Sequence, residues 1–269
     1  MIRGVFHRMF QELRLFLLAL QFMTRVPVPR WVGFDPVCLN RSARHFAGVG
    51  LLVGGFGAAM LWVAGRAWPM PVAVGLSMAA TLWLTGAFHE DGFADTCDGL
   101  GGAASRERAL EIMKDSRIGA YGAIGIATML GLKAATLATL PLATAVPALV
   151  LGHSASRAAA TALMGLLPYA GDAAHAKAKP LAQQAGKAEL VGAALWVAML
   201  CGGLWVSGAM AAPALASALA SAAVAALVCA RWLWRRLGGF TGDTLGAAQQ
   251  LCELALLLGV SAATRAELP

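Results

Sequence analysis

The chain has few charged residues. Asp, Glu, Lys and Arg together make up 13% of its 269 residues, whereas about 25% is usual for a soluble domain. Hydrophobic residues make up 59%, and the mean hydropathy is +0.68. This composition excludes an ordinary soluble protein and predicts one that is embedded in a membrane.

Cysteine motifs and a concentrated basic patch are also missing. The five cysteines form no C-x-x-C pair and no His/Cys pairing at zinc spacing, which argues against a disulfide framework and a structural zinc site. The net charge of +7 comes from Lys and Arg that fall between apolar stretches, without interleaved aromatic residues. We therefore expect no nucleic acid partner.

The N-terminus lacks the cleavage site of a signal peptide. Its apolar run, residues 15–23, is short and is followed by Thr24, Arg25 and Pro27 instead of small residues. A basic, moderately apolar segment of this kind predicts an amphipathic helix that lies in the membrane interface.

Long apolar runs, in contrast, are frequent. A helix needs roughly 20 apolar residues to cross a bilayer, and about seven segments meet this criterion: 46–65, 71–88, 120–141, 144–167, 190–210, 212–230 and 244–261. The sequence predicts an all-α, polytopic helical bundle that forms a single integral membrane domain over residues 1–269. Within it, residues 1–45 form a cytoplasmic or interfacial N-terminal segment, and residues 89–118 form a cytoplasmic acidic segment.

Lys and Arg alternate between the loops in a way that predicts topology. They are dense before the first span, in the acidic segment, in the 172–189 loop and in the 231–243 loop, and scarce in the loops between. Because cytoplasmic loops carry the excess of positive charge, these four segments are expected in the cytoplasm. Seven spans would then place the C-terminus on the other side.

Negative charge is concentrated in one segment. Half of the 14 acidic residues lie between Glu90 and Asp115. Asp91, Asp95 and Asp98 are spaced i, i+4, i+7, so that on a helix they would share one face. We expect this helix to be the cytoplasmic end of the second span, ended in a left-handed cap by Gly99, Gly101 and Gly102.

Three adjacent carboxylates repel one another and call for a cation. Oxygen ligands without His or Cys favour Mg²⁺, Mn²⁺ or Ca²⁺, and a pair of such ions would suit a phosphate displacement. Glu90 lies at the same rim, whereas we interpret His89 as a hydrogen-bonding interfacial residue. The alternative is a solvated acidic loop balanced by nearby Lys and Arg, and Glu107 and Glu111 are interpreted as ordinary surface partners of such charges.

Other polar residues complete the candidate site. Lys114 and Arg117 could bind a diphosphate, and Asp115 could complete the metal shell or accept a proton; alternatively the two cations are membrane anchors. Arg157 lies with Lys133 and His153 at bilayer depth, where it would either line a polar cavity and reach a phosphate or form a structural ion pair. Asp243, in a polar turn that opens the last helix, would be an N-cap, a metal or substrate ligand, or both.

Glycines recur at short spacing in two spans. They are Gly50, Gly54, Gly55 and Gly57 in the first span and Gly119, Gly122 and Gly125 at the start of the third. This pattern is typical of closely packed membrane helices.

Four motifs together resemble a known family. FHEDGFADTCDGLGG and EIMKDSRIGAYG, with QFMTRVPVP near the N-terminus and FTGDTLGAAQQLCE near the C-terminus, are similar to cobalamin synthase, formally adenosylcobinamide-GDP ribazoletransferase. The likeness covers essentially the whole chain. It implies a bacterial inner-membrane enzyme whose active site faces the cytoplasm. The enzyme would use Mg²⁺, or Mn²⁺ in its place, to join adenosylcobinamide-GDP to α-ribazole or its 5′-phosphate with release of GMP.

The resemblance also implies roles for individual residues. The metal would be held by Glu90, Asp91, Asp95 and Asp98. Catalysis would use Asp95, Asp98 and Asp115, and the substrates and their phosphates would meet Thr24, Arg25, Lys114 and Arg117. The interpretation of the residues themselves adds Arg157 and Asp243 as candidates for substrate binding. The lipid bilayer is the other expected partner, and the chain could also form a homo-oligomer.

Two other functions are weaker. CDP-alcohol phosphotransferases carry a related acidic motif, but where that pattern has Arg after Ala, this chain has Asp95 after Ala94. A transporter would place its binding residues near the midplane, often in repeated halves. The chain shows no internal repeat and has its acidic residues at one rim.

Overall fold

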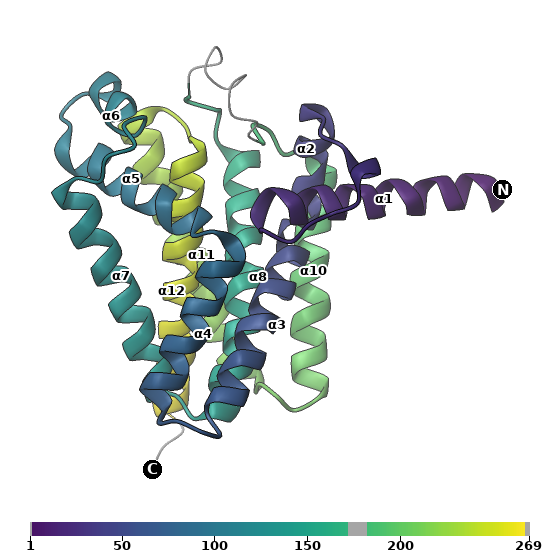
Figure 1. Ribbon diagram of the computed structural model, residues 1–269, viewed down its shortest axis with the longest axis vertical. Helices are drawn as coiled ribbons and strands as arrows, with labels where there is room; N and C mark the ends of the chain where they lie inside the picture. The colour runs from purple at the N-terminus through teal and green to yellow at the C-terminus, as the bar shows by residue number, and fades with distance from the viewer. Residues whose placement is uncertain (1, 172–181, 267–269) are drawn as a thin grey trace.

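A computed structural model describes residues 2–171 and 182–266, which are almost entirely helical (Figure 1). In this part of the chain the sole β feature is an isolated parallel bridge between Tyr169 and Phe240. The helices are α1 (Ile2–Met23), α2 (Pro36–Ser42), α3 (Phe46–Ala64), α4 (Met70–Thr85), α5 (Phe88–Gly102), α6 (Arg106–Ile112), α7 (Ala120–Thr139), α8 (Leu142–Leu166), α10 (Lys187–Val206), α11 (Ala212–Leu237) and α12 (Gly242–Ala266). Two short 3-10 helices, η1 (Arg30–Val32) and η2 (Ala43–His45), connect α1 to α3.

The structure confirms an all-α polytopic bundle and has a helix at each of the seven expected positions. Among the described residues, five segments are long and apolar enough to cross a membrane: 36–64, 120–139, 187–206, 212–237 and 242–266. The pair α4 and α5 makes a sixth if the two are counted as one broken span. Helix α8 has 25 residues but is more polar, because it carries His153, Arg157 and several hydroxyl side chains.

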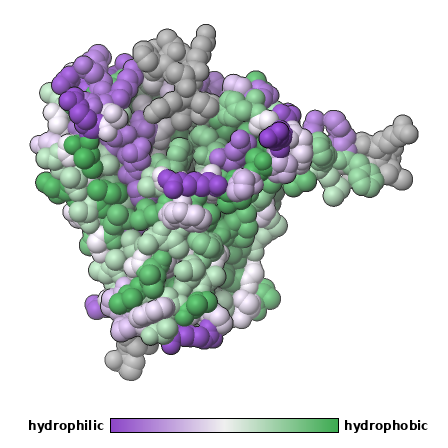
Figure 2. Space-filling view, in the orientation of Figure 1, coloured by the Kyte–Doolittle hydropathy of each residue, from purple (hydrophilic) through white to green (hydrophobic). Residues whose placement is uncertain are grey.

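The loops gather at two ends of the bundle as the charge pattern predicted. In Figure 1, α1, α2, α6 and the α11–α12 connection lie at the upper end, and the α3–α4, α7–α8 and α10–α11 connections lie at the lower end with the C-terminus. Figure 2 shows hydrophilic residues at both ends and a hydrophobic belt between them. We call the end that carries α5 and α6 the acidic end.

Helix α1 crosses the bundle axis and extends away from it (Figure 1). Its first half exposes Phe6, Met9, Phe10 and Leu13, spaced as one helical stripe, while Leu18 in its second half is buried. This arrangement agrees with a helix in the membrane interface.

Polar contacts hold α1 against the bundle. Arg44 of η2 pairs with Glu12 of α1 (Nη1 to Oε1, 3.1 Å) and with Glu189 of α10 (Nη2 to Oε1, 2.5 Å). The Nε2 atom of His45 lies 2.9 Å from the second oxygen of Glu12. These contacts join α1, η2 and α10 at the acidic end.

The sequence predicts that the acidic helix is the end of the second span, and this prediction is wrong. Helices α4 and α5 meet at 90°, because Gly86 (φ +67°) and Ala87 (φ +56°) both adopt left-handed backbone conformations between them. The predicted left-handed cap at Gly99, Gly101 and Gly102 is wrong. These glycines lie within α5, whose C-cap is Ala103 in an extended conformation.

Helix α8 lies at the centre of the bundle, packed against α3, α10, α11 and α12. Glycine makes the α3–α8 approach close: a Cβ at Gly50 would overlap the His153 carbonyl, and one at Gly54 would lie 2.8 Å from Val150 Cα. The predicted glycine packing is therefore confirmed, except at Gly55, which has nothing within 4 Å. The result is a closely packed central helix that carries polar side chains into the interior.

Candidate active site

Helix α5 is fixed in place by a close backbone crossing with α12. A Cβ at Gly92 would lie 2.8 Å from the carbonyl oxygen of Asp243, and one at Gly246 would lie 3.0 Å from that of His89. Both positions therefore need glycine for the two helices to touch. The crossing brings the acidic motif and the C-terminal motif together although about 150 residues separate them.

The acidic residues of α5 point to different neighbours. Both carboxylate oxygens of Asp98 accept backbone N–H groups at the start of α7, from Gly119 at 2.7 Å and from Gly122 at 2.8 Å. Asp91 is exposed, and Asp95 is half-buried. Over the described ranges no three His, Cys, Asp or Glu side chains lie close enough to surround one ion. The shared focus of three aspartates expected from their spacing is therefore not seen.

Glu90 is the acidic residue of α5 that faces the interior. One of its oxygens accepts a hydrogen bond from Gln250 Nε2 at 2.8 Å, and the other, Oε2, is buried with no hydrogen-bond partner. An unpaired buried carboxylate oxygen is costly and fits a site for a cation. The oxygen donors of Glu90, Asp91 and Asp95 thus suit Mg²⁺ in kind.

Asp115 and Arg117 pair with each other. The guanidinium donates from Nη2 to Oδ2 at 2.6 Å and from Nε to Oδ1 at 3.0 Å. These bonds and the backbone N–H of Arg117 lower the pKa of Asp115 to about 2, and the carboxylate raises the pKa of Arg117. A carboxylate with so low a pKa is a weak base.

The other charged residues of the acidic end lie on its surface. Arg108 pairs with Glu111 at 2.6 Å, as predicted for surface partners. Arg106 instead donates to the backbone carbonyls of Leu237 and Ala170, which ties α6 to α11. Lys114 is exposed.

The N-terminal motif lies beside the bend that precedes α5. Thr24 uses its hydroxyl at the end of α1, where it donates to the Leu20 carbonyl at 2.7 Å and accepts the Val26 N–H at 3.2 Å. The Arg25 N–H donates to the Leu84 carbonyl at 2.8 Å, and a Cβ at Gly86 would lie 2.7 Å from Arg25 Nε. Arg25 therefore covers the bend, and Thr24 shapes the backbone that carries it.

The polar turn expected before the last helix is present, but Asp243 is not its N-cap. Thr241 takes this position: its hydroxyl accepts the Thr244 N–H at 3.3 Å, and the Thr244 hydroxyl accepts the Thr241 N–H at 2.8 Å. Asp243 lies in the first turn of α12 and is half-buried.

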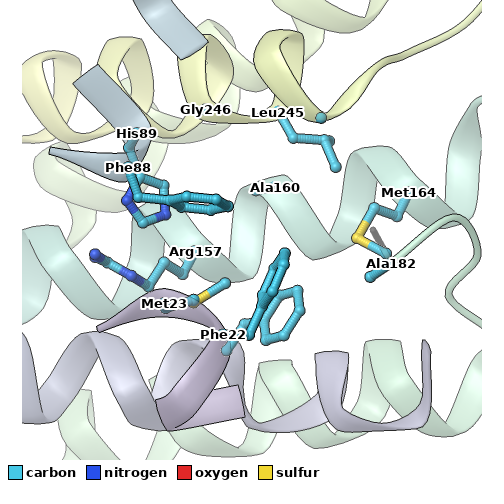
Figure 3. Close-up of a pocket in the computed structure, with 12 residues that line it drawn as sticks. Phe22, Met23, Phe88, His89, Arg157, Ala160, Met164, Ala182, Leu245 and Gly246 are labelled. Carbon is cyan, nitrogen blue, oxygen red and sulfur yellow. The ribbon is translucent and has the colours of Figure 1, made fainter. Parts of the chain in front are cut away.

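A pocket brings these segments together (Figure 3). It is lined by Phe22 and Met23 of α1, Phe46 of α3, Phe88 and His89 of α5, Arg157, Ala160 and Met164 of α8, Ala182, and Gly242, Leu245 and Gly246 of α12. His89 is buried, with 4% of its surface exposed. Arg157 lines the pocket, which agrees with the prediction that it lines a cavity.

A buried polar network below α5 was missed by the sequence analysis. Glu253 of α12 pairs with Lys133 of α7 (Oε1 to Nζ, 2.5 Å) and lies 3.3 Å from Nδ1 of His153. Gln249 donates to Glu253 at 2.7 Å, and Lys133 donates to Gln250 at 3.1 Å. The signal that could have found this network is the polar trio Gln249, Gln250 and Glu253 within an otherwise apolar span.

The chain is similar in sequence to known proteins over most of its length. The chain is 59% identical over 251 residues, 92% of this chain and 95% of the relative, to the adenosylcobinamide-GDP ribazoletransferase of Leptothrix cholodnii. It is 47% identical to the protein of the same name from Albidiferax ferrireducens, over 94% of this chain and 99% of that one, and 45% identical to that from Shewanella amazonensis, over 92% and 95%. No solved structure matches. The model of the cobalamin-5-phosphate synthase family matches residues 15–261, and the chain belongs to this family.

Proposed function

We propose that the protein is a transferase of late cobalamin biosynthesis that joins adenosylcobinamide-GDP to α-ribazole or its 5′-phosphate and releases GMP. The relatives it matches over almost their whole length bear the name of this activity. The structural observation that supports the proposal most is the pocket. Five helices and Ala182 line it, and they include the segments that carry the N-terminal, acidic and C-terminal motifs.

The reaction exchanges a phosphoanhydride bond for a phosphate ester bond. A ribose hydroxyl of the ribazole attacks the phosphorus that bears cobinamide, a new P–O bond forms, and the bond to the GMP oxygen breaks. The hydroxyl proton must go to a base. We assign this role to Asp95, which is half-buried in α5, in preference to Asp115 with its lowered pKa.

We infer that Mg²⁺ would be held by Glu90, whose Oε2 is buried without a hydrogen-bond partner, and by Asp91, with oxygens of the substrate diphosphate as its further ligands. Once bound, it would neutralise charge on the diphosphate and on the departing GMP. Asp98 has both oxygens engaged by the α7 backbone, so its part is to hold α7 against α5. Lys114 and Arg117 lie at the exposed acidic end, where they would attract the anionic substrate.

We propose that the reaction takes place at the cytoplasmic face of the bacterial inner membrane. The support is the excess of Lys and Arg in the loops of the acidic end. Nucleotide-linked substrates are water-soluble and would reach α5 from this side.

The test is GMP release by the purified protein in detergent. With adenosylcobinamide-GDP, α-ribazole and Mg²⁺ we expect GMP in amounts equal to the corrinoid product, and none after chelation of the metal. Asp91→Asn and Asp95→Asn should each lower kcat by at least about 100-fold, because the first removes a metal ligand charge and the second removes the proposed base. Glu107→Gln, a matched change on the exposed face of α6, should leave the rate unchanged; GMP release in excess EDTA would overturn the metal assignment.

A further inference from the structure

Gln250 of α12 lies between a carboxylate and a buried ammonium group. Its Nε2 donates to Glu90 Oε1 at 2.8 Å, and its Oε1 accepts a hydrogen bond from Lys133 Nζ at 3.1 Å. Only 2% of Gln250 and 4% of Lys133 are exposed. A glutamine at this depth is costly unless its amide is hydrogen-bonded. Here both ends of the amide are bonded, each to a group that carries a charge.

These two neighbours fix the direction in which the amide points. An ammonium group can only donate hydrogen bonds, so the amide atom that meets Lys133 must be the oxygen. The amide nitrogen then faces Glu90, whose ionised carboxylate can only accept. Nε2 also donates to Gln249 Oε1 at 2.9 Å. Rotation of the amide by half a turn would set donor against donor and acceptor against acceptor.

Glu90 and Lys133 share the space beside this amide. Both line a cavity of about 10 Å³ that is bounded by α4, α5, α7, α8 and α12, which has room for about one water molecule. The lysine stem is flexible, and opposite charges attract strongly in the protein interior. If the amide were absent, the two side chains could pair directly. The pair would occupy Glu90 Oε2, the buried oxygen that has no hydrogen-bond partner among the described residues.

Glu253 holds Lys133 from the other side. It forms the ion pair with Lys133, and its second oxygen accepts a hydrogen bond from Gln249 Nε2 at 2.7 Å. Glu90 and Glu253 also both interact electrostatically with Arg157 of α8. The two carboxylates thus lie in the same field of buried positive charge. Glu253 contacts the lysine directly, whereas Gln250 lies between the lysine and Glu90.

We propose, on the basis of the metal site in the proposed function, that Gln250 is a positioning residue that keeps Glu90 apart from Lys133. It thereby leaves Oε2 of Glu90 free for a divalent cation. Gln250 itself contacts neither the metal nor the substrate, and it acts through Glu90. Hydrogen bonds that orient a metal ligand in this way are worth about 10–100-fold in metal affinity.

Mn²⁺ binding without turnover tests this role. Mn²⁺ is titrated into the full chain in detergent with adenosylcobinamide-GDP but no ribazole, and free Mn²⁺ is measured by electron paramagnetic resonance. Gln250→Met, which keeps the length of the side chain but not its hydrogen bonds, should raise the Kd for Mn²⁺ at least about 10-fold.

Gln249→Met is the matched control. Gln249 is adjacent and fully buried, and its amide nitrogen donates to Glu253 and Ser156 instead of to Glu90. This variant should keep the wild-type Kd for Mn²⁺ even if its melting temperature falls. A wild-type Kd in Gln250→Met, or an equal loss in Gln249→Met, would overturn the proposal. If Gln250→Met does not fold, Gln250→Asn takes its place with the same expectation, because it is too short to bond both neighbours.

A background without the lysine tests the cause. In the double variant Lys133→Met, Glu253→Gln, no ammonium group remains to pair with Glu90, so the further change Gln250→Met should leave the Kd for Mn²⁺ unchanged. An undiminished loss of affinity in this background would show that Gln250 does not act by keeping the two charges apart.

Failure of the proposed function would look different. If Glu90 is not a metal ligand, Glu90→Gln should bind Mn²⁺ as the wild type does, whereas failure of the role of Gln250 alone leaves Glu90→Gln impaired and Gln250→Met normal. If the protein is not the transferase, the wild type should release no GMP with either ribazole.

Discussion

At the scale of single residues, Glu253 joins three helices in the interior. Its carboxylate lies between Lys133 of α7 and His153 of α8, with 1% of its side chain exposed. Removal of one partner of a buried ion pair leaves an uncompensated charge and costs about 3–5 kcal/mol. We expect Glu253→Gln to lower the melting temperature of the purified protein strongly in a thermal unfolding assay.

The double variant Lys133→Met, Glu253→Gln checks the cause. With both charges gone, neither member of this ion pair is left without its partner, so the double variant should recover more than half of the lost melting temperature. Equal losses in the single and double variants would show that the pair contributes by shape alone. Glu107→Gln, on the exposed face of α6, is the control for loss of one carboxylate.

The pKa of Asp115 gives a prediction on pH dependence. Arg117 holds this pKa at about 2, below the ordinary value of 3.8. The stabilisation from the charged pair is therefore present above pH ~4 and is lost only as pH falls toward about 2. An acid limb of kcat/KM between about pH 5 and 9 must come from another group, so Asp115→Asn should leave its midpoint unchanged. Disappearance of that limb in the variant would identify Asp115 as the base.

Residue roles could be predicted from the sequence only where the partner is local. The Glu111 pair with Arg108 is three residues apart on one helix, and helical spacing suggests it. The partners of Asp98 lie 21 and 24 residues away, on a helix whose placement depends on tertiary packing. The same holds for Glu90, whose partner Gln250 is 160 residues distant.

At the scale of helices, the crossing of α5 and α12 depends on glycine. Ala at position 92 would place Cβ 2.8 Å from the Asp243 carbonyl oxygen and 2.9 Å from its Cα, and backbone atoms cannot yield as a side chain can. Helix α5 must then move away from α12. Displacements near 1 Å cost about 100-fold in rate, so Gly92→Ala should lower kcat/KM by about that factor in the GMP-release assay.

Gly75→Ala is the matched control for this change. Gly75 lies within α4 and has nothing within 4 Å of the position of a Cβ. The variant should keep the wild-type rate. A normal rate in Gly92→Ala as well would mean that the crossing does not position the acidic residues.

Helices were predictable from apolar length, but their breaks were not. Continuous apolar runs place all seven predicted spans within about five residues, except that α11 extends to Leu237 instead of ending at residue 230. The bend between α4 and α5 has a weaker signal, because Gly86 is followed by Ala87, and Ala rarely adopts a positive φ. The fold imposes this conformation through the packing of Arg25 over Gly86 and of α5 on α12.

At the scale of the whole molecule, orientation can be measured by cysteine labelling. In a variant with the five native cysteines replaced, Glu111→Cys and Arg66→Cys would each supply one exposed thiol at opposite ends of the bundle. Because the acidic end carries the excess of Lys and Arg, a membrane-impermeant maleimide should label Glu111→Cys only in inside-out vesicles and Arg66→Cys only in right-side-out vesicles. The reverse pattern would place the acidic end in the periplasm.

The shortness of α4 has a consequence for the surrounding lipid. Its 16 residues rise about 24 Å at 1.5 Å per residue, less than the roughly 30 Å of hydrocarbon in a typical bilayer. The bilayer beside α4 would therefore be thinner than average, so that its head groups reach the 90° bend between α4 and α5. The protein would thus thin the membrane beside α5, where the proposed corrinoid substrate would approach.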